Sequence, residues 1–200
     1  MTRPVEFYFD FSSPYAYLSA QVIDDLGERH GREVAWRPYL LGVVFKITGQ
    51  QPLLGMPVKG DYARRDLRRS ARLLDVPFTV PETFPFMSTA ACRAFYWLSD
   101  RDAGAAKDLA KALFAAAFGR GEDVAGAEAV VEVAAGLGVD GAELAAALQD
   151  QGVKDRLRQE VESAVGKGVF GSPFFIVDDE PFWGHDHLPD VERWLEEGGW

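Results

Sequence analysis

The stretch Phe7-Tyr8-Phe9-Asp10-Phe11-Ser12-Ser13-Pro14-Tyr15-Ala16-Tyr17-Leu18 decides how the rest of the chain is interpreted. The aromatic and β-branched run from Val5 to Phe11 predicts a short buried strand. Pro14 then occupies a plausible first helical position, and apolar residues recur at helical spacing as far as Leu26. A serine hydroxyl is therefore expected where a strand turns into a helix, beside unpaired backbone N–H groups. That place suits an anion or a thiolate, although a serine there is also an ordinary helix cap.

Composition narrows the class of protein. The 200 residues, 48% of them hydrophobic, are enough for one sizeable core with an inserted subdomain. The formal net charge of −10 disfavours nucleic acid as a partner. No apolar run is long enough to span a bilayer, and the first strand leaves no room for a signal peptide, so a cytoplasmic location is expected. The single cysteine, Cys92, excludes an intramolecular disulfide and is expected to be an inert buried thiol.

The segments that follow the first strand and helix continue an alternating pattern. A second strand is predicted over 33–41, and strand, helix and strand within about forty residues indicate a right-handed βαβ unit. The Gly- and Pro-rich segment 42–60 is predicted to be a long binding loop. A helix is predicted over 61–74. It carries arginines that either form a solvated face paired with acids or guide an anionic substrate, namely Arg64, Arg65, Arg68, Arg69 and Arg72.

The second half of the chain is helical until its last thirty or so residues. The pattern predicts helices over 88–101, 105–119, 127–136, 140–149 and 153–167. A β-hairpin with strands at 174–177 and 181–183 and a closing helix over 188–197 complete the chain.

These elements predict an α/β fold, a thioredoxin-like mixed sheet flanked by helices with a large all-helical insertion. Residues 1–42 and 168–200 are expected to form the thioredoxin-like domain, and residues 43–167 the helical insert domain.

Gly168-Val169-Phe170-Gly171-Ser172-Pro173 is the second informative stretch. Pro173 directly precedes a core strand, where proline is tolerated only at the edge or the start. A cis peptide between Ser172 and Pro173 is expected to leave the N–H and C=O of Ser172 free to pair with an extended peptide ligand. The alternative is an ordinary trans proline that ends a glycine-rich loop.

Four segments together resemble the 2-hydroxychromene-2-carboxylate isomerase family, namely 9–15, 37–46, 168–173 and 182–186. That family belongs to the DsbA-like branch of thioredoxin folds and is similar to kappa-class glutathione transferases. The resemblance runs over essentially the whole chain, including the helical insert.

The resemblance implies a glutathione-dependent cis–trans isomerase that interconverts 2-hydroxychromene-2-carboxylate and trans-o-hydroxybenzylidenepyruvate in aromatic catabolism. It implies that Ser13 contacts the glutathione sulfur, that Lys46 and Gln50 contact the substrate, and that glutathione is bound by Ser172, Trp183, Gly184, His185 and Asp186. A serine in this place is expected to donate a hydrogen bond to the thiolate and to lower the pKa of the thiol. The expected partner is a small aromatic-derived oxo-acid, with no nucleic acid and no membrane. Relatives are commonly dimers, but the sequence leaves open whether this chain forms a homodimer.

Several positions depart from the family pattern or have ordinary alternative roles. Gln50 and Met87 stand where many relatives have asparagine, and His185 and His187 replace the usual Asn and Arg. The residues expected to bind glutathione therefore follow the family pattern more closely than those expected to bind the substrate, so the sequence defines the identity of the substrate less closely than that of the cofactor. Asp186 could simply cap the last helix, and Lys46 could be a solvated surface residue. No metal site is expected, because the remaining histidine, His30, lies in a separate helix.

Two other functions stay open from the sequence alone. A kappa-like glutathione transferase would use the same thiolate and consume it, and a thioredoxin-fold binding protein would have no activity. A disulfide oxidoreductase is excluded, because no cysteine lies near Ser13.

Overall fold

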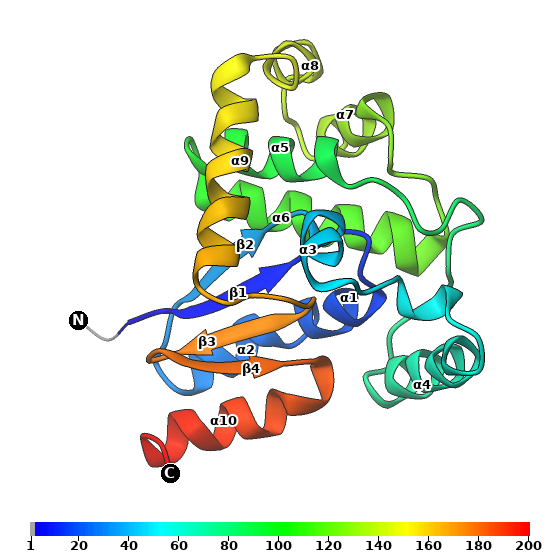
Figure 1. Ribbon diagram of the computed structural model, residues 1–200. Coiled ribbons are helices and arrows are strands. Elements are labelled where there is room, and N and C mark those ends of the chain that lie inside the picture. The colour runs from blue at the N-terminus through cyan, green and yellow to red at the C-terminus, as the bar shows by residue number, and fades with distance from the viewer. Residues whose placement is uncertain (1–2) are drawn as a thin grey trace.

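A four-stranded mixed sheet lies at the centre of the computed structural model, which describes residues 3–200 (Figure 1). Its strand order is β2-β1-β3-β4, with β1 parallel to β2 and antiparallel to β3, and with β3 antiparallel to β4. The strands are β1 (Val5–Phe9), β2 (Val34–Pro38), β3 (Phe174–Val177) and β4 (Glu180–Trp183). Helices flank the sheet and a helical block is inserted between its halves, so the predicted fold class is confirmed.

The central strand β1 is almost continuously apolar because both of its faces are covered. Val5, Phe7 and Phe9 are fully buried. The ring of Phe7 stacks on Phe175 of β3, with centroids 5.5 Å apart, and on Phe9 at 4.9 Å. The first stretch of the sequence therefore forms the core of the sheet, although the strand ends at Phe9 rather than at Phe11.

The helix predicted after β1 is two helices. α1 (Pro14–Ala20) begins at Pro14, as expected, with Ser13 as its N-cap. The helical conformation is interrupted at Val22, and α2 (Ile23–Arg29) follows as a separate helix. The apolar spacing continues through both helices, which is why the sequence predicts one.

The segment 42–60, predicted to be a loop, contains a helix and part of another. α3 (Leu41–Thr48) and a 3-10 turn, η1 (Leu53–Gly55), precede α4 (Lys59–Leu73). The prediction was wrong because α3 is rich in Gly and β-branched residues, which have low helix propensity. Its first backbone N–H donates to the buried carboxylate of Asp10, so a tertiary contact stabilises what the local sequence does not.

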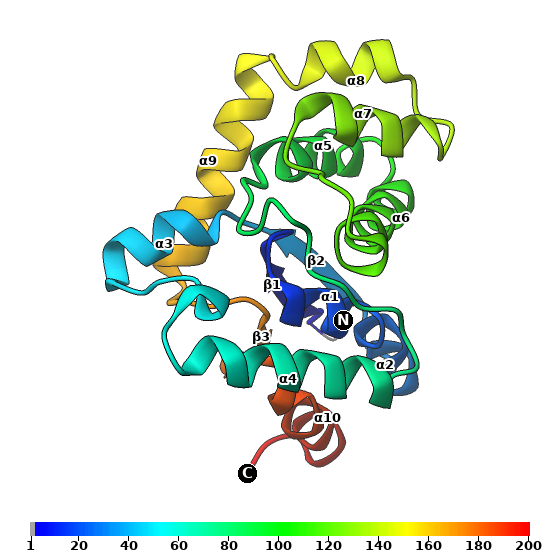
Figure 2. The same ribbon diagram turned by 90° about the vertical axis from the view of Figure 1, so that its right-hand side faces the viewer.

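The predicted helical block is present with small shifts of boundary. It comprises α5 (Thr89–Ser99), α6 (Ala103–Phe114), a π-helical turn η2 (Ala115–Arg120), α7 (Ala127–Ala135), α8 (Gly141–Ala147) and α9 (Gln151–Gly166). Figure 2 shows the block on one side of the sheet, with α4 running across the near side of the molecule, below α1 and above α10. None of the helices within residues 3–200 is long and apolar enough to cross a membrane.

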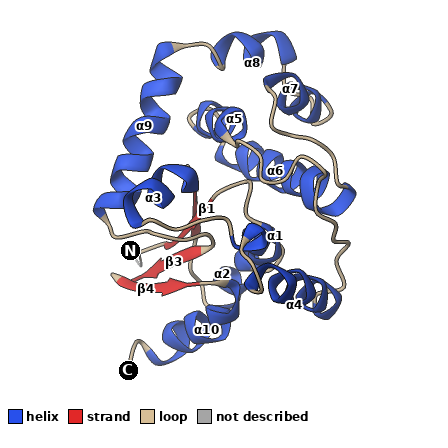
Figure 3. Ribbon diagram, turned by 45° about the vertical axis from the view of Figure 1, so that its right-hand side comes forward, coloured by secondary structure: helices blue, strands red, loops and turns tan. Residues whose placement is uncertain are grey.

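The C-terminal hairpin is formed as predicted. Asp178 and Asp179 both have positive φ, which a two-residue hairpin turn requires. A 3-10 turn, η3 (His185–His187), joins β4 to α10 (Leu188–Glu197), which lies beneath the sheet on the side away from the helical block (Figure 3).

Aromatic rings join the helical block to the sheet. The ring centroid of Phe114, at the end of α6, lies 5.5 Å from that of Phe9, 5.2 Å from that of Phe11 and 6.3 Å from that of Tyr17. All four side chains are buried, so block and sheet share one core.

Phe114→Ala is therefore expected to destabilise the whole chain, by about 3–5 kcal/mol in free energy of unfolding. Far-ultraviolet and near-ultraviolet circular dichroism during urea unfolding should report one common transition at a lower midpoint. Leu137→Ala, at a half-exposed position, should change stability by no more than about 0.5 kcal/mol. Two separate transitions in the Phe114 variant would show that block and sheet unfold independently.

Candidate functional site

Ser13 and Ser172 meet where the two ends of the chain come together. The Ser13 hydroxyl donates to the backbone carbonyl of Ser172 at 2.7 Å and accepts from the N–H of Ala16 at 3.2 Å. Ser13 is thus both a helix cap and a contact to the proline loop, whose Ser172–Pro173 peptide is cis, as expected.

Of the two backbone groups of Ser172 that were expected to be unpaired, only the N–H is unpaired in the structure. The carbonyl oxygen of Ser172 already accepts a hydrogen bond from the Ser13 hydroxyl. The hydroxyl must be the donor of this bond, because a carbonyl oxygen can only accept. The N–H of Ser172 has no acceptor anywhere in residues 3–200, and neither does the N–H of Tyr15 in the first turn of α1. Two backbone N–H donors at the Ser13 turn therefore remain available to an anionic group, while the Ser13 hydroxyl is engaged with the Ser172 carbonyl.

A buried carboxylate beneath this turn holds its parts together. Asp10 accepts from the N–H and hydroxyl of Ser12, both at 2.8 Å, and from the N–H of Leu41 at 2.7 Å. The backbone carbonyl of Asp10 accepts from Ser13, and its backbone N–H donates to the hydroxyl of Ser172 at 2.9 Å. Burial raises the pKa of the Asp10 carboxyl, and hydrogen bonds from Ser12, Leu41 and Ser88 offset that effect only in part.

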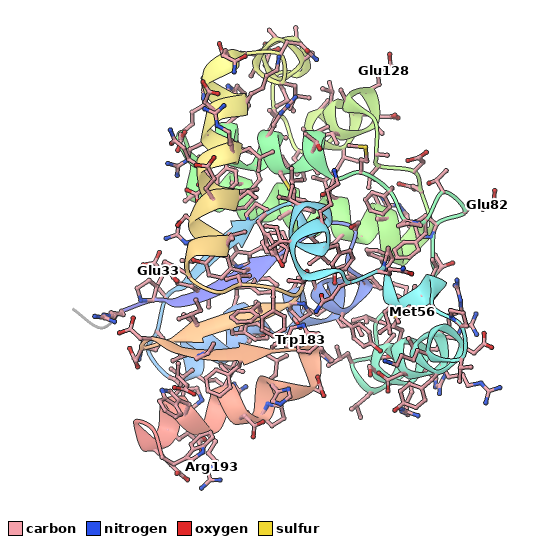
Figure 4. The ribbon with its side chains drawn as sticks, viewed as in Figure 1. Glu33, Met56, Glu82, Glu128, Trp183 and Arg193 are labelled. Carbon is pink, nitrogen blue, oxygen red and sulfur yellow. The ribbon has the colours of Figure 1, made fainter. Side chains whose placement is uncertain are left out.

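The turn after β4 lies against the proline loop. Trp183 is half exposed, and a Cβ atom on Gly171 would lie 2.0 Å from its indole Nε1, so the ring covers this glycine closely. Gly184 has a φ of 109°, which other residues rarely adopt. In Figure 4 Trp183 lies at the end of the hairpin that faces α4. The position of the Trp183 ring therefore requires glycine at 171, where a side chain would collide with the indole, and the turn after Trp183 requires glycine at 184.

His185 points inward from the same turn. Its Nδ1 lies 3.0 Å from the hydroxyl of the buried Ser19 in α1. Burial lowers the pKa of the His185 imidazole, against the opposing effect of the carboxylates of Asp186 and Asp66. Asp186, by contrast, has a side chain that is 85% exposed. It does not cap α10, whose N-cap residue is His187 and which has no side-chain cap hydrogen bond.

The segment wrongly predicted as a loop contributes the opposite wall. Lys46 lies in the last turn of α3, and Gln50 follows just after that helix ends; both are exposed. Met87, in the loop before α5, is 75% exposed. An exposed lysine beside apolar side chains can hold an anion while the apolar groups contact the rest of a ligand.

One cavity of about 1600 Å³ connects these walls. Every site residue predicted from the sequence lines it, namely Ser13, Lys46, Gln50, Ser172, Trp183, Gly184, His185 and Asp186. The structure thus brings all of them together, while their individual roles stay predictions.

The structure also adds lining residues that the sequence analysis missed. From α4, the side chains of Tyr62, Asp66 and Ser70 face the cavity. The hydroxyl of Tyr15 donates to Asp66 at 2.8 Å, and burial together with Asp66 raises the pKa of Tyr15. Tyr15 belongs to the first stretch of the sequence, but its partner is 51 residues away, so no local pattern indicates the pair.

The positions of the α4 arginines and of Cys92 bear on two expectations from the sequence. None of the five α4 arginines lines the cavity within residues 3–200, which favours a solvated face, although the structure pairs only Arg69 with a carboxylate, that of Asp66. Cys92 is fully buried, and burial raises the pKa of its thiol well above the ordinary value, as expected of an inert thiol.

The chain matches known proteins over nearly its whole length. The DSBA-like thioredoxin domain matches residues 4–196. The chain is 31% identical to 2-hydroxychromene-2-carboxylate isomerase of Sphingobium xenophagum, over 98% of this chain and 99% of the relative. It is 28% identical to glutathione S-transferase kappa 2 of Caenorhabditis elegans, over 98% and 92%. A solved structure of a 2-hydroxychromene-2-carboxylate isomerase superposes with a TM-score of 0.88 at 27% identity, covering 96% of this chain and 94% of the other.

Replacing the buried carboxylate gives a test of the network around Ser13. Because the folded-state pKa of Asp10 is raised, ionisation of this group costs stability in the folded protein. The stability of the wild type relative to Asp10→Asn should be greatest below about pH 4, near the unfolded-state pKa, and should fall as pH rises through the folded-state pKa. Urea unfolding of both proteins at a series of pH values measures the difference. A difference that is constant, or that grows with pH, contradicts the assignment.

Proposed function

The chain belongs to the DSBA-like thioredoxin family, with 2-hydroxychromene-2-carboxylate isomerases and kappa-class glutathione transferases among its relatives, and on that premise we propose that it is a glutathione-dependent cis–trans isomerase. Its substrate is an aromatic-derived unsaturated oxo-acid of the 2-hydroxychromene-2-carboxylate type. The observation that carries the proposal is Ser13, placed at the start of α1 with its hydroxyl on the proline loop and facing the same cavity as Lys46.

The residues present fit glutathione. Ser172 offers an unpaired backbone N–H beside the hydroxyl of Ser13, which suits a cysteinyl-containing peptide laid along the proline loop. Trp183 and Asp186 border the same cavity, and an exposed carboxylate suits the amino group of a γ-glutamyl arm. Small-molecule pockets usually measure roughly 300–1000 Å³, so about 1600 Å³ has room for the tripeptide and a second small molecule.

Bound along Ser172, Trp183 and Asp186, glutathione would supply a thiolate, the nucleophile that a reversible addition–elimination at a conjugated double bond requires. Ser13 contributes a hydrogen-bond donor. Its proton points to the Ser172 carbonyl, so stabilising a thiolate requires the hydroxyl to rotate away from that acceptor. A serine hydroxyl that donates to sulfur favours the charged form and lowers the pKa of the thiol.

Lys46 and the apolar wall orient the substrate. Lys46 lines the cavity, and its ammonium group pairs with the substrate carboxylate or with the pyruvyl oxygen, where negative charge develops. Val43, Leu53 and Met87 supply apolar surface on the same side for an aromatic ring. Because Met87 cannot donate a hydrogen bond, ring contact rather than polar recognition determines the fit there.

Isomerase and transferase activity differ in what happens to the thiol. Incubation with glutathione and 2-hydroxychromene-2-carboxylate should interconvert the isomers at constant free thiol. Loss of thiol in proportion to product would identify a transferase instead. Absence of both changes, with glutathione binding still measurable by calorimetry, would identify a binding protein.

Ser13→Ala tests how the thiol is activated. A hydrogen bond to a charged group is worth about 1.5–3 kcal/mol, so the pKa of the bound thiol should rise by about one to two units. Activity near neutral pH should fall roughly ten- to a hundredfold and recover partly as pH rises, while glutathione affinity changes little. The matched control is Ser12→Ala, whose hydroxyl contacts Asp10 and not Ser172.

A pH–rate profile and a thermal melt of both variants separate the alternatives. A covalent nucleophile at Ser13 predicts loss of activity at every pH. A helix cap alone predicts about 1 kcal/mol of lost stability with an unchanged profile. A profile of the Ser12 variant displaced as far as that of the Ser13 variant would show that the shift does not come from the Ser13 hydroxyl.

A further inference from the structure

A second cluster of side chains, which could together bind a metal ion, lies where α2 meets α10. His30, at the C-terminal end of α2, faces Glu192 and Glu196 of α10. One ligand atom from each of the three side chains lies within 4.8 Å of the other two. Glu192 also borders the cavity of about 1600 Å³, but the proposed isomerase reaction assigns no role to any of the three side chains.

The imidazole of His30 is the unusual member of the cluster. Its side chain is only 15% exposed, and its Nε2 atom is buried without a hydrogen-bond partner in residues 3–200. A buried ring nitrogen without a partner is uncommon, because an unsatisfied polar group costs free energy. The nearest carboxylate oxygen, Oε1 of Glu192, is 3.5 Å from Nε2, with a geometry that does not form a hydrogen bond.

The 3.5 Å between Nε2 of His30 and Oε1 of Glu192 matches the distance between two ligand atoms of one metal ion. Bonds of about 2.0–2.2 Å to zinc place neighbouring ligand atoms about 3.3–3.5 Å apart in a tetrahedral site. Glu196 follows Glu192 by four residues, so both carboxylates leave the same face of α10. The side chain of Glu196 is exposed and is free to rotate toward the other two.

A neighbouring charge orients the first carboxylate. Arg29 forms an ion pair with Oε1 of Glu192, which holds that side chain beside His30. Partners of this kind typically position metal ligands. Arg193, on the same helix, pairs with Glu197 instead and points outward into solvent (Figure 4). Within α10, the carboxylates at 192 and 196 are therefore those turned toward His30.

We propose that His30, Glu192 and Glu196 form a binding site for a divalent transition-metal ion of the zinc type, which joins α2 to α10. One imidazole and two carboxylates suit Zn²⁺ and its neighbours Co²⁺ and Ni²⁺, whereas Mg²⁺ and Ca²⁺ prefer oxygen ligands alone. Three protein ligands leave a fourth position for water. The ion connects residues more than 160 positions apart in the chain.

Calorimetric titration of the untagged full chain with Zn²⁺, in a background of millimolar Mg²⁺, tests the site. One equivalent should bind, and Zn²⁺ at a hundred times its Kd should raise Tm by roughly 5–10 °C. His30→Gln and Glu196→Gln should each weaken binding at least tenfold. Because Glu196 is exposed, its variant is expected to fold even where the His30 variant does not.

His187 provides the control. His187 lies near Asp186 and Asp190, at 3.7 and 4.0 Å, and is the competing location for an ion. His187→Gln should bind Zn²⁺ as the wild type does. The proposal is overturned if the wild type binds no Zn²⁺ at submillimolar concentration, if Glu196→Gln binds unchanged, or if His187→Gln loses binding.

Discussion

The buried carboxylate of Asp10 is the constraint on which the rest of the site depends. A carboxylate without solvent is costly unless several donors surround it, and here the donors come from Ser12 and from the first turn of α3. The backbone of the same residue binds Ser13 and the hydroxyl of Ser172. A single residue just after β1 therefore holds the start of α1, the start of α3 and the proline loop in fixed relation, through its carboxylate and its backbone.

The relative positions of α1, α3 and the proline loop determine the shape of the cavity. Its polar end is the Ser13 turn with the proline loop, and its opposite wall is formed by α3, η1 and α4, with Met56 beside α4 in Figure 4. A large apolar surface with a few fixed donors is the usual composition of a small-molecule site, because the apolar area supplies affinity and the donors supply orientation. The helical block supports this arrangement from the other side through Phe114 and its aromatic neighbours.

The fold alone does not distinguish among the activities of its relatives. Isomerases and transferases are both among the relatives of this chain, and function depends on the residues placed on the shared scaffold. In this chain a serine occupies the start of α1, and the one cysteine is buried at Cys92. A pair of reactive cysteines at the start of α1, as dithiol–disulfide exchange requires, is thereby excluded.

The sequence by itself determined the strands, most helices and the fold class, because period, proline position and turn residues are local signals. The predicted site residues came from the resemblance to a known family, and the structure brings them together on one cavity. The sequence did not predict α3, which has weak helix propensity and whose first N–H is satisfied by Asp10 from 31 residues away. It left open whether Asp186 caps α10, and the structure shows that it does not. It also gave no sign that Tyr15 meets Asp66 or that His30 meets Glu192. Only the tertiary structure decided these points, because local patterns encode which elements form, whereas the packing of those elements decides which distant side chains share a buried environment.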